Sequence, residues 1–113
     1  MANDNYQQIA KVGDVREGDV IAVTLPSGHE VVLTKVGGQI YALDAICTHQ
    51  EAWFDSGYVD RATLELQCPL HEGRFDIRTG AATHEPAIDP IRAYELRVEG
   101  NLVFLGPAKP LAT

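Results

Sequence analysis

Short runs of alternating apolar and polar residues follow one another along most of the chain. The pattern is clearest in residues 94–98, which read Tyr-Glu-Leu-Arg-Val. Alternation with a period of two is typical of a β-strand that buries one face. The sequence predicts strands of this kind at 20–25, 30–36, 40–43, 63–67, 74–77, 92–98 and 102–106.

Turn-forming sequences separate these runs. They read PSGH at 26–29, GGQ at 37–39, RTG at 78–80 and EGN at 99–101. No segment of ten or more residues has apolar residues at a helical spacing. We therefore expect an all-β protein of antiparallel hairpins, whose first strand begins near residue 8 and whose residues 1–7 form a mobile tail.

Length and charge narrow the class of protein. A chain of 113 residues is expected to fold as one domain. No apolar run approaches the roughly 20 residues that cross a bilayer, and the first residues, MANDNYQQIAK, do not resemble a secretory signal. A cytoplasmic protein without a membrane segment is expected. The net charge of −7 argues against nucleic acid as a partner.

Both cysteines of the chain lie in short segments that also contain a histidine. Cys47 and His49 belong to the stretch AICTHQ, and Cys68 and His71 belong to QCPLHEG. Thiolates and imidazoles together indicate a zinc ion, a copper ion or an iron–sulfur cluster. A disulfide between the cysteines would leave the two histidines without a role and is disfavoured in the cytoplasm. From the residues alone, zinc and an iron–sulfur cluster both remain open.

The residues around these four resemble the signature of the Rieske 2Fe–2S proteins. The string C-T-H, followed after eighteen residues by C-P-L-H-E-G-R-F-D-I-R-T-G, matches the family pattern of C-x-H and C-x-x-H. Further residues in the places where the family has them are Gly57, Tyr58, Gly73, Phe75, Arg78, Thr79, Gly80 and Pro86. The spacing of eighteen is at the long end for the family, and Glu72 replaces a common glycine. The resemblance extends over about residues 8–106.

This resemblance implies a cofactor, its ligands and a division of the chain. It implies one Rieske-type 2Fe–2S cluster, with Cys47 and Cys68 on one iron and His49 and His71 on the other. It also implies a base of strands from about 8–44 and 91–106, which carries a smaller cluster-binding subdomain at about 45–86.

Four residues near the predicted ligands indicate the kind of Rieske centre. High-potential members of the family have a disulfide between the two ligand loops, but this chain has Ala52 and Leu70 in those places. High-potential members also have a serine and a tyrosine whose hydroxyls donate hydrogen bonds to the cluster, and here Gly73 and Phe75 replace them. Because such hydrogen bonds raise the potential, we expect a low-potential centre.

Low-potential Rieske proteins of this length resemble the ferredoxin components of bacterial aromatic-ring-hydroxylating dioxygenases. This resemblance implies an electron carrier that takes single electrons from a flavin-containing NAD(P)H reductase and passes them to a terminal oxygenase. The chain is too short for a mononuclear-iron domain, so no enzyme activity and no substrate site are expected, and a monomer is expected. Two alternatives remain: the Rieske subunit of another redox enzyme, such as nitrite reductase, and a zinc-binding module for protein interactions.

Several residues near the predicted ligands are candidates for a docking surface. Trp53 is expected either beside the cluster or packed under the first ligand segment, and Glu51, Asp55 and Glu72 are expected to form an acidic rim or ordinary solvated charges.

The two remaining histidines are not expected to be ligands. His29 lies in the turn PSGHE and is expected on the surface, away from both ligand segments. His84 lies two residues before Pro86, in the segment expected to cover the cluster, where ligation is already complete.

Overall fold

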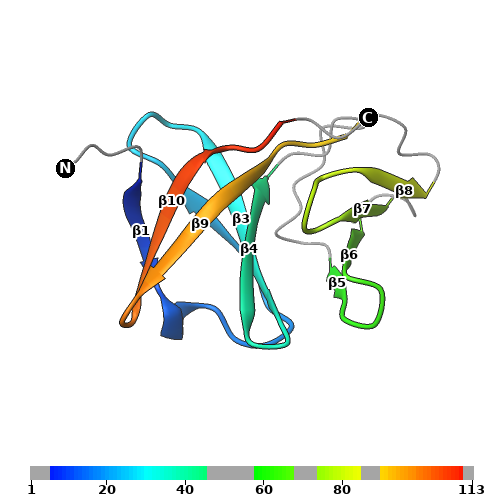
Figure 1. Cartoon of the computed structure of the whole chain (residues 1–113), viewed down its shortest axis with the longest axis horizontal. Helices are drawn as coiled ribbons and strands as arrows, with labels where there is room; N and C mark the ends of the chain where they lie inside the picture. The colour runs from blue at the N-terminus through cyan, green and yellow to red at the C-terminus, as the bar shows by residue number, and fades with distance from the viewer. Residues whose placement is uncertain (1–5, 46–57, 68–73, 85–89, 111–113) are drawn as a thin grey trace.

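The chain folds into two antiparallel β-sheets that lie side by side (Figure 1). The computed structural model describes residues 6–45, 58–67, 74–84 and 90–110. The larger sheet has six strands in the order β1-β10-β9-β4-β3-β2, and the smaller has four in the order β5-β6-β7-β8. The all-β fold with antiparallel sheets is therefore confirmed.

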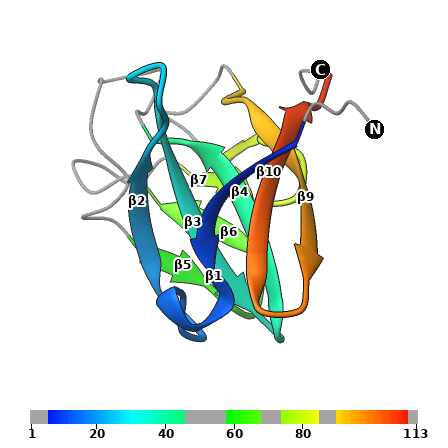
Figure 2. The ribbon, with the colours of Figure 1, turned by 90° about the vertical axis from the view of Figure 1, so that its left-hand side faces the viewer.

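The six-stranded sheet is built from both ends of the chain. Its strands are β1 (Gln7–Lys11), β2 (Val20–Thr24), β3 (Glu30–Val36), β4 (Gln39–Asp44), β9 (Ala93–Glu99) and β10 (Leu102–Ala108). A single 3₁₀ turn, η1 (Val12–Asp14), follows β1. Figure 2 shows how strongly this sheet curls. Strand β9 joins the strands from the two ends of the chain, because it pairs with β10 on one side and with β4 on the other.

Strand β3, EVVLTKV, is buried on both faces, in agreement with the uninterrupted apolar run Val31–Leu33 at its centre. Val31 and Leu33 contribute to a core enclosed by the curled six-stranded sheet, together with Val103 and Leu105 of β10. Val32 faces the opposite way, into a second core that also contains side chains of the smaller sheet. Strand β3 thus contributes to both cores, as does β4, which places Leu43 in one and Ile40 in the other.

The smaller sheet consists of strands of only three residues. They are β5 (Tyr58–Asp60), β6 (Glu65–Gln67), β7 (Arg74–Asp76) and β8 (Ala82–His84). Leu66 and Phe75 are fully buried and pack with Val32 and Leu43 of the larger sheet. Strands this short bury little area on their own, so packing against the larger sheet stabilises the smaller one.

A tight turn between β7 and β8 connects the smaller sheet to the chain that enters β9. The Asp76 carboxylate accepts hydrogen bonds from the Arg78 backbone N–H (2.7 Å) and guanidinium (2.8 Å). Gly80 has a φ of +82°, and its carbonyl accepts a hydrogen bond from the Ile91 N–H at 2.9 Å. A Cβ at position 80 would overlap the Ile91 carbonyl oxygen, so only glycine fits there.

The structure differs from the predicted strands at the chain start and in the smaller sheet. Strand β1 begins at Gln7, and the Arg97 guanidinium lies 4.4 Å from the centre of the Tyr6 ring. This cation–π contact holds Tyr6 next to the first residue of β1, which lies one position before the predicted start. The predicted strand 63–67 begins only at Glu65, because Leu64 has a φ of +60° and belongs to the turn after β5.

Candidate metal centre

Each of the four strands of the smaller sheet begins or ends along the same side of the sheet, perpendicular to the strand direction. The start of β5 pairs with the end of β6 through Tyr58 and Gln67. Gln67 also pairs with Arg74 at the start of β7, and Arg74 pairs with His84 at the end of β8. The residues Tyr58, Gln67, Arg74 and His84 therefore form one row across the sheet, which we call the edge row.

The edge row is where the segments with the predicted ligands join the sheet. Cys68 and His71 lie in residues 68–73, which connect Gln67 to Arg74, and Cys47 and His49 lie in residues 46–57, which end at Tyr58. All four predicted ligands are outside the described residues. The register nevertheless brings the attachment points of both segments to neighbouring strands, which the Cys-x-His and Cys-x-x-His pieces require in order to share one site.

The chain enters the first of these segments from a firmly anchored point. Ala45 is buried, and its N–H donates to the Glu30 carbonyl at 3.2 Å. The Asp44 N–H donates to the Arg92 carbonyl at 2.9 Å, and the Asp44 carboxylate accepts a hydrogen bond from the Tyr94 hydroxyl at 2.6 Å. These bonds come from β3, from the approach to β9 and from β9 itself. They hold the end of β4, the last described part of the chain before Cys47.

His29 contacts Asp44, the last residue of β4, from which the chain continues into this segment. Its ring is half-exposed, as expected for a surface residue, but its Nε2 lies 2.9 Å from Asp44 Oδ1. Asp44 is three residues before Cys47. The hairpin of β2 and β3 places residue 29 beside the end of β4. The ligand segments lie outside the described residues, so the expectation that His29 is distant from them stays a prediction.

A network of polar side chains ties the strands below the edge row together. The Arg74 guanidinium donates to Asp60 Oδ2 at 3.0 Å, to Glu65 Oε1 at 3.2 Å and to the Tyr58 hydroxyl at 3.3 Å. The Tyr58 hydroxyl in turn donates to the Gln67 side chain. The hydrogen bond from Arg74 lowers the pKa of Asp60, with a smaller contribution from the Ala62 N–H. The network joins β5, β6 and β7 through one cation, Arg74.

The sequence alone did not identify Arg74 as a functional candidate. Its partners lie nine to sixteen residues away, and only the register of the three strands brings them together. Phe75, whose lack of a hydroxyl supports a low potential, is fully buried in the core between the sheets. His84 forms the last position of β8 rather than part of a covering loop.

Other candidates from the sequence lie outside the described residues. These are Glu51, Ala52, Trp53, Asp55, Gly57, Leu70, Glu72, Gly73 and Pro86. Within the ranges that the structure describes, no group of three or more His, Cys, Asp or Glu side chains is arranged to hold a metal ion. The candidate centre therefore depends on the two segments that join the edge row. No helix in these same ranges is long and apolar enough to cross a membrane.

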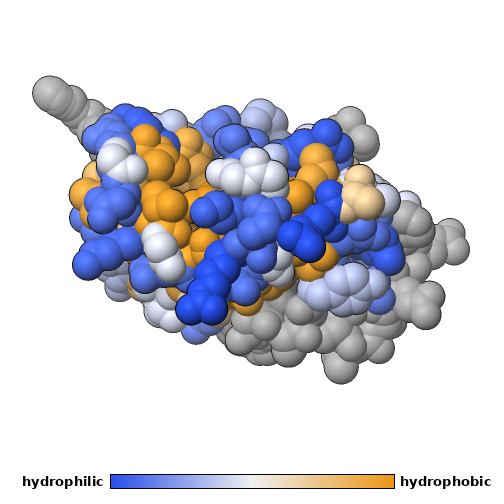
Figure 3. Space-filling model, turned by 90° about the horizontal axis from the view of Figure 1, so that it is seen from below, coloured by the Kyte–Doolittle hydropathy of each residue, from blue (hydrophilic) through white to orange (hydrophobic). Residues whose placement is uncertain are grey.

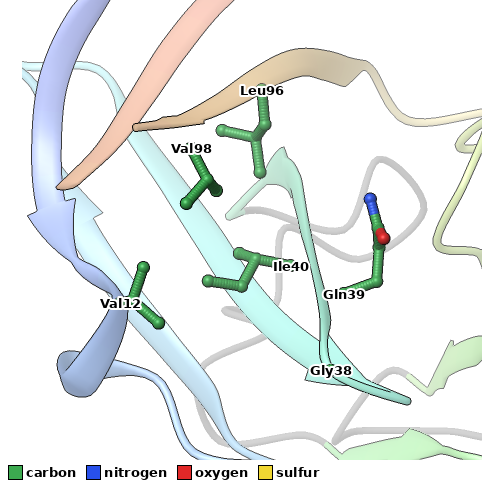
Figure 4. Close-up of a pocket in the computed structure, with 6 residues that line it drawn as sticks. All are labelled: Val12, Gly38, Gln39, Ile40, Leu96 and Val98. Atoms are coloured by element: carbon green, nitrogen blue, oxygen red, sulfur yellow. The ribbon is translucent and has the colours of Figure 1, made fainter. Parts of the chain in front are cut away.

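A shallow cavity lined by four apolar side chains and by Gly38 and Gln39 lies in the six-stranded sheet, between β4 and β9. Apolar side chains gather on this half of the molecule when it is seen from below (Figure 3). Val12, Ile40, Leu96 and Val98 point toward one another across the opening (Figure 4), which has a volume of about 270 Å³. The cavity contains no metal-ligating side chain and is separate from the edge row.

A family model and the sequences of known proteins both match most of the chain. The family model described as the Rieske [2Fe-2S] domain matches residues 5–95. The chain is 40% identical over 101 residues to the ferredoxin component of the naphthalene 1,2-dioxygenase/salicylate 5-hydroxylase systems of Ralstonia sp., covering 89% of this chain and 94% of the relative.

Two solved structures extend this similarity to the fold. The ferredoxin of carbazole 1,9a-dioxygenase from Nocardioides aromaticivorans IC177 has a TM-score of 0.84 and 37% identity, covering 92% of this chain and 99% of that one. A chain from a complex of reduced oxygenase and oxidised ferredoxin in carbazole 1,9a-dioxygenase has a TM-score of 0.85 and 26% identity, covering 97% and 100%.

Proposed function

Because the chain belongs to the Rieske [2Fe-2S] domain family, we propose that it is an electron carrier with one Rieske-type 2Fe–2S cluster. The observation that supports this most directly is the edge row, which joins the Cys-x-His and Cys-x-x-His segments at neighbouring strands. A donor set of two thiolates and two imidazoles fits such a cluster. When bound, the cluster accepts and releases one electron.

We further propose that Cys47, His49, Cys68 and His71 are the ligands. The register supports this assignment, because Cys68 directly follows Gln67 and the first segment ends at Tyr58, the strand partner of Gln67. The two sheets also support the division into a base and a smaller cluster-binding part, since β1–β4, β9 and β10 form one sheet and β5–β8 the other.

The residues of this chain position the centre rather than perform chemistry on a substrate. The bonds to Asp44 and Ala45 hold the start of the first ligand segment, and Arg74 holds the strands from which the second emerges. Phe75, Leu66 and their neighbours form an apolar core below. A rigid support of this kind keeps the reorganisation that accompanies electron transfer small, which suits a carrier.

We propose that its partners are a flavin-containing NAD(P)H reductase and the terminal oxygenase of an aromatic-ring-hydroxylating dioxygenase. The names of the relatives support this, since they are ferredoxin components of naphthalene and carbazole dioxygenase systems, and one neighbour is a complex of oxygenase and ferredoxin. These relatives favour the dioxygenase role over a nitrite reductase subunit or a zinc module. Transient electron-transfer contacts are small, which agrees with a monomeric carrier.

The experiment is reconstitution of electron flow with purified protein. The protein is expected to be reddish-brown, to give after dithionite reduction an EPR spectrum with the low average g of a mixed Cys/His cluster, and to transfer electrons from NADH and a dioxygenase reductase to a terminal oxygenase. Cys68→Ser is the matched negative control. A colourless protein that contains zinc would contradict the proposal, as would a coloured protein that such a reductase cannot reduce.

A further inference from the structure

Strands β4 and β9 pair over a short length and then separate (Figure 1). Their register consists of two residue pairs, of which Ala42 with Tyr94 is the one at the diverging side. Strand β4 nevertheless begins at Gln39, and β9 continues to Glu99. Beyond the last pair, the facing sides of the two strands pair with no described strand. The six-stranded sheet therefore has an internal opening bordered by residues 39–41 and 95–98, which we call the β4–β9 slot.

Two cavities adjoin the β4–β9 slot. The first is the cavity of about 270 Å³ into which four apolar side chains point (Figure 4). The second has a volume of about 150 Å³, and its lining includes the polar residues Tyr41, Glu95 and Lys109. Ile40 and Leu96 line both cavities. The slot thus connects a mainly apolar space with a polar one.

The backbone beside the slot is suited to binding an extended segment. In an antiparallel strand, alternate residues direct their N–H and C=O groups to the same side, and an edge without a partner strand can accept another chain there. The part of β9 that contains Leu96 and Val98 has β10 on one side and the slot on the other. The Val98 side chain is 50% exposed, which is unusual for a large apolar residue among those described. An open strand edge beside an exposed apolar side chain is the arrangement that β-strand addition uses.

The size of the apolar cavity indicates what kind of group enters it. Pockets for drug-sized ligands begin at roughly 300 Å³, and the cavity of about 270 Å³ is smaller and shallow. It therefore suits individual side chains of a peptide better than a separate small molecule. Because the side chains of a strand alternate between its two faces, every second residue of such a peptide would point into the cavity.

Charge determines the preferred residue on the polar side of the slot. Glu95 is exposed, and no described residue forms an ion pair or hydrogen bond with its side chain. The other charges nearby are engaged: Arg97 lies 2.7 Å from Glu99, and the Lys109 ammonium donates to the Arg78 carbonyl at 2.9 Å. The net charge of −7 also attracts cations at longer range. A basic side chain opposite Glu95 is thus complementary to the slot.

We propose that the β4–β9 slot binds an extended peptide segment of a partner protein, antiparallel to β9. Apolar residues of the segment lie opposite Val98 and Leu96 and enter the cavity, a neutral residue lies opposite Arg97, and a basic residue lies opposite Glu95. This anchoring surface goes beyond the proposed electron transfer. It consists of residues of the larger sheet and of η1, and it lies apart from the edge row.

The test uses the tetrapeptide acetyl-Val-Thr-Val-Lys-amide, which has this pattern over the four positions 98 to 95. Amide chemical shifts of the isotope-labelled oxidised holoprotein are followed as the peptide is added. We expect saturable shifts concentrated in residues 39–42 and 94–98. Replacing both valines of the peptide by serine is expected to weaken binding about tenfold or more, because apolar burial is lost. Replacing its lysine by glutamate is expected to weaken binding about two- to fivefold, as for an exposed ion pair. Shifts that do not saturate, or that lie outside the slot, would overturn the proposal.

Two substitutions and a matched control test the same surface from the side of the protein. Glu95→Lys is expected to reverse the preference between the lysine and glutamate peptides. Glu30→Lys makes the same change in charge at the far end of β3 and is expected to keep the preference. A preference that both variants keep, or that both lose, would refute the role of Glu95.

Val98→Asp places a charge at the mouth of the apolar cavity without disturbing a buried position. Peptide binding is expected to fall about tenfold or more, and wild-type affinity in this variant would contradict the proposal. Sedimentation of the free protein distinguishes another occupant. We expect a species whose mass does not depend on concentration. A dimer that Val98→Asp dissociates would identify a second copy of this chain as the occupant and would overturn the assignment to a peptide.

Discussion

Gly80 offers the sharpest test of how the smaller sheet is held, because the chain contains a matched control. Gly80 and Gly38 have nearly the same φ, +82° and +80°. A Cβ at position 38 would meet no atom within 4 Å, whereas a Cβ at position 80 would overlap the Ile91 carbonyl oxygen. Substituting each by alanine therefore imposes the same backbone strain but adds a collision only at position 80.

The expected losses of stability differ severalfold. A left-handed conformation costs an L-residue roughly 1–2 kcal/mol, and loss of glycine's freedom in the unfolded chain offsets about 0.4–1 kcal/mol of this. Gly38→Ala is therefore expected to lower the free energy of unfolding by about 1 kcal/mol. In Gly80→Ala the backbone must also move away from Ile91, which disrupts the bond from the Ile91 N–H and the bond from Gly80 N–H to Asp76. The backbone strain of about 1 kcal/mol, the two bonds at about 1 kcal/mol each and about 1–3 kcal/mol of overpacking give a total of about 4–6 kcal/mol.

Denaturant unfolding of the two variants and the wild type, monitored by circular dichroism, measures both losses. A thermal scan provides a second readout, in which 1 kcal/mol corresponds to a shift of about 4 °C in Tm for a domain of this size. Equal losses in the two variants would refute the reasoning, because they would mean that the contact between the β7–β8 turn and Ile91 contributes nothing. A visible spectrum of each variant reports whether the cluster site survives the change.

Three further predictions concern charges and the centre itself. Arg74→Met is expected to raise the pKa of Asp60, which Arg74 depresses below its ordinary 3.8. Stability from a depressed carboxyl pKa is present above the unfolded value and is lost as pH falls through the folded one. The difference in unfolding free energy between wild type and variant should therefore shrink below about pH 4, and a difference that grows in acid would count against the network. Tyr94 has a raised pKa, mainly through burial, so its stabilising contribution is present below pH 10 and is lost as pH rises further. Alkaline unfolding of Tyr94→Phe should accordingly depend less on pH than that of the wild type; identical alkaline profiles would contradict this. Finally, voltammetry of the holoprotein should give a potential near the low end of the Rieske range, roughly −150 mV, and a value above about +100 mV would refute the reasoning from Gly73 and Phe75.

The sequence predicted the strands that are recognisable from their own residues and from the turns beside them. Strand β3 was clear because a β-branched apolar run stands between two glycine-containing turns. Strands β5 and β8 were not predicted, since three residues are too few to show a period and their pairing depends on the sheet that they join.

In the candidate site, too, local sequence patterns were informative and long-range contacts were not predictable. The four proposed ligands stand out in the sequence because cysteine and histidine at these spacings are rare and specific, and their role stays a prediction. Contacts over long sequence separations do not stand out in this way. His29 and Asp44 are 15 residues apart, and Tyr94 is 50 residues beyond Asp44. No local pattern connects such residues, and only the pairing of β3, β4 and β9 brings them to one point.

The orientation of the smaller sheet has a practical consequence for measuring currents. The turn at residues 61–64 lies at the opposite ends of β5 and β6 from the edge row, and Ala62 in that turn is exposed. Maleimide chemistry at an introduced Ala62→Cys would tether the protein to an electrode by this turn. Molecules immobilised in this way would present the edge row to the solution. Attachment at the other end of the strands would instead place the edge row against the electrode surface. The β5–β6 hairpin is thus a suitable attachment site for an oriented protein layer on an electrode.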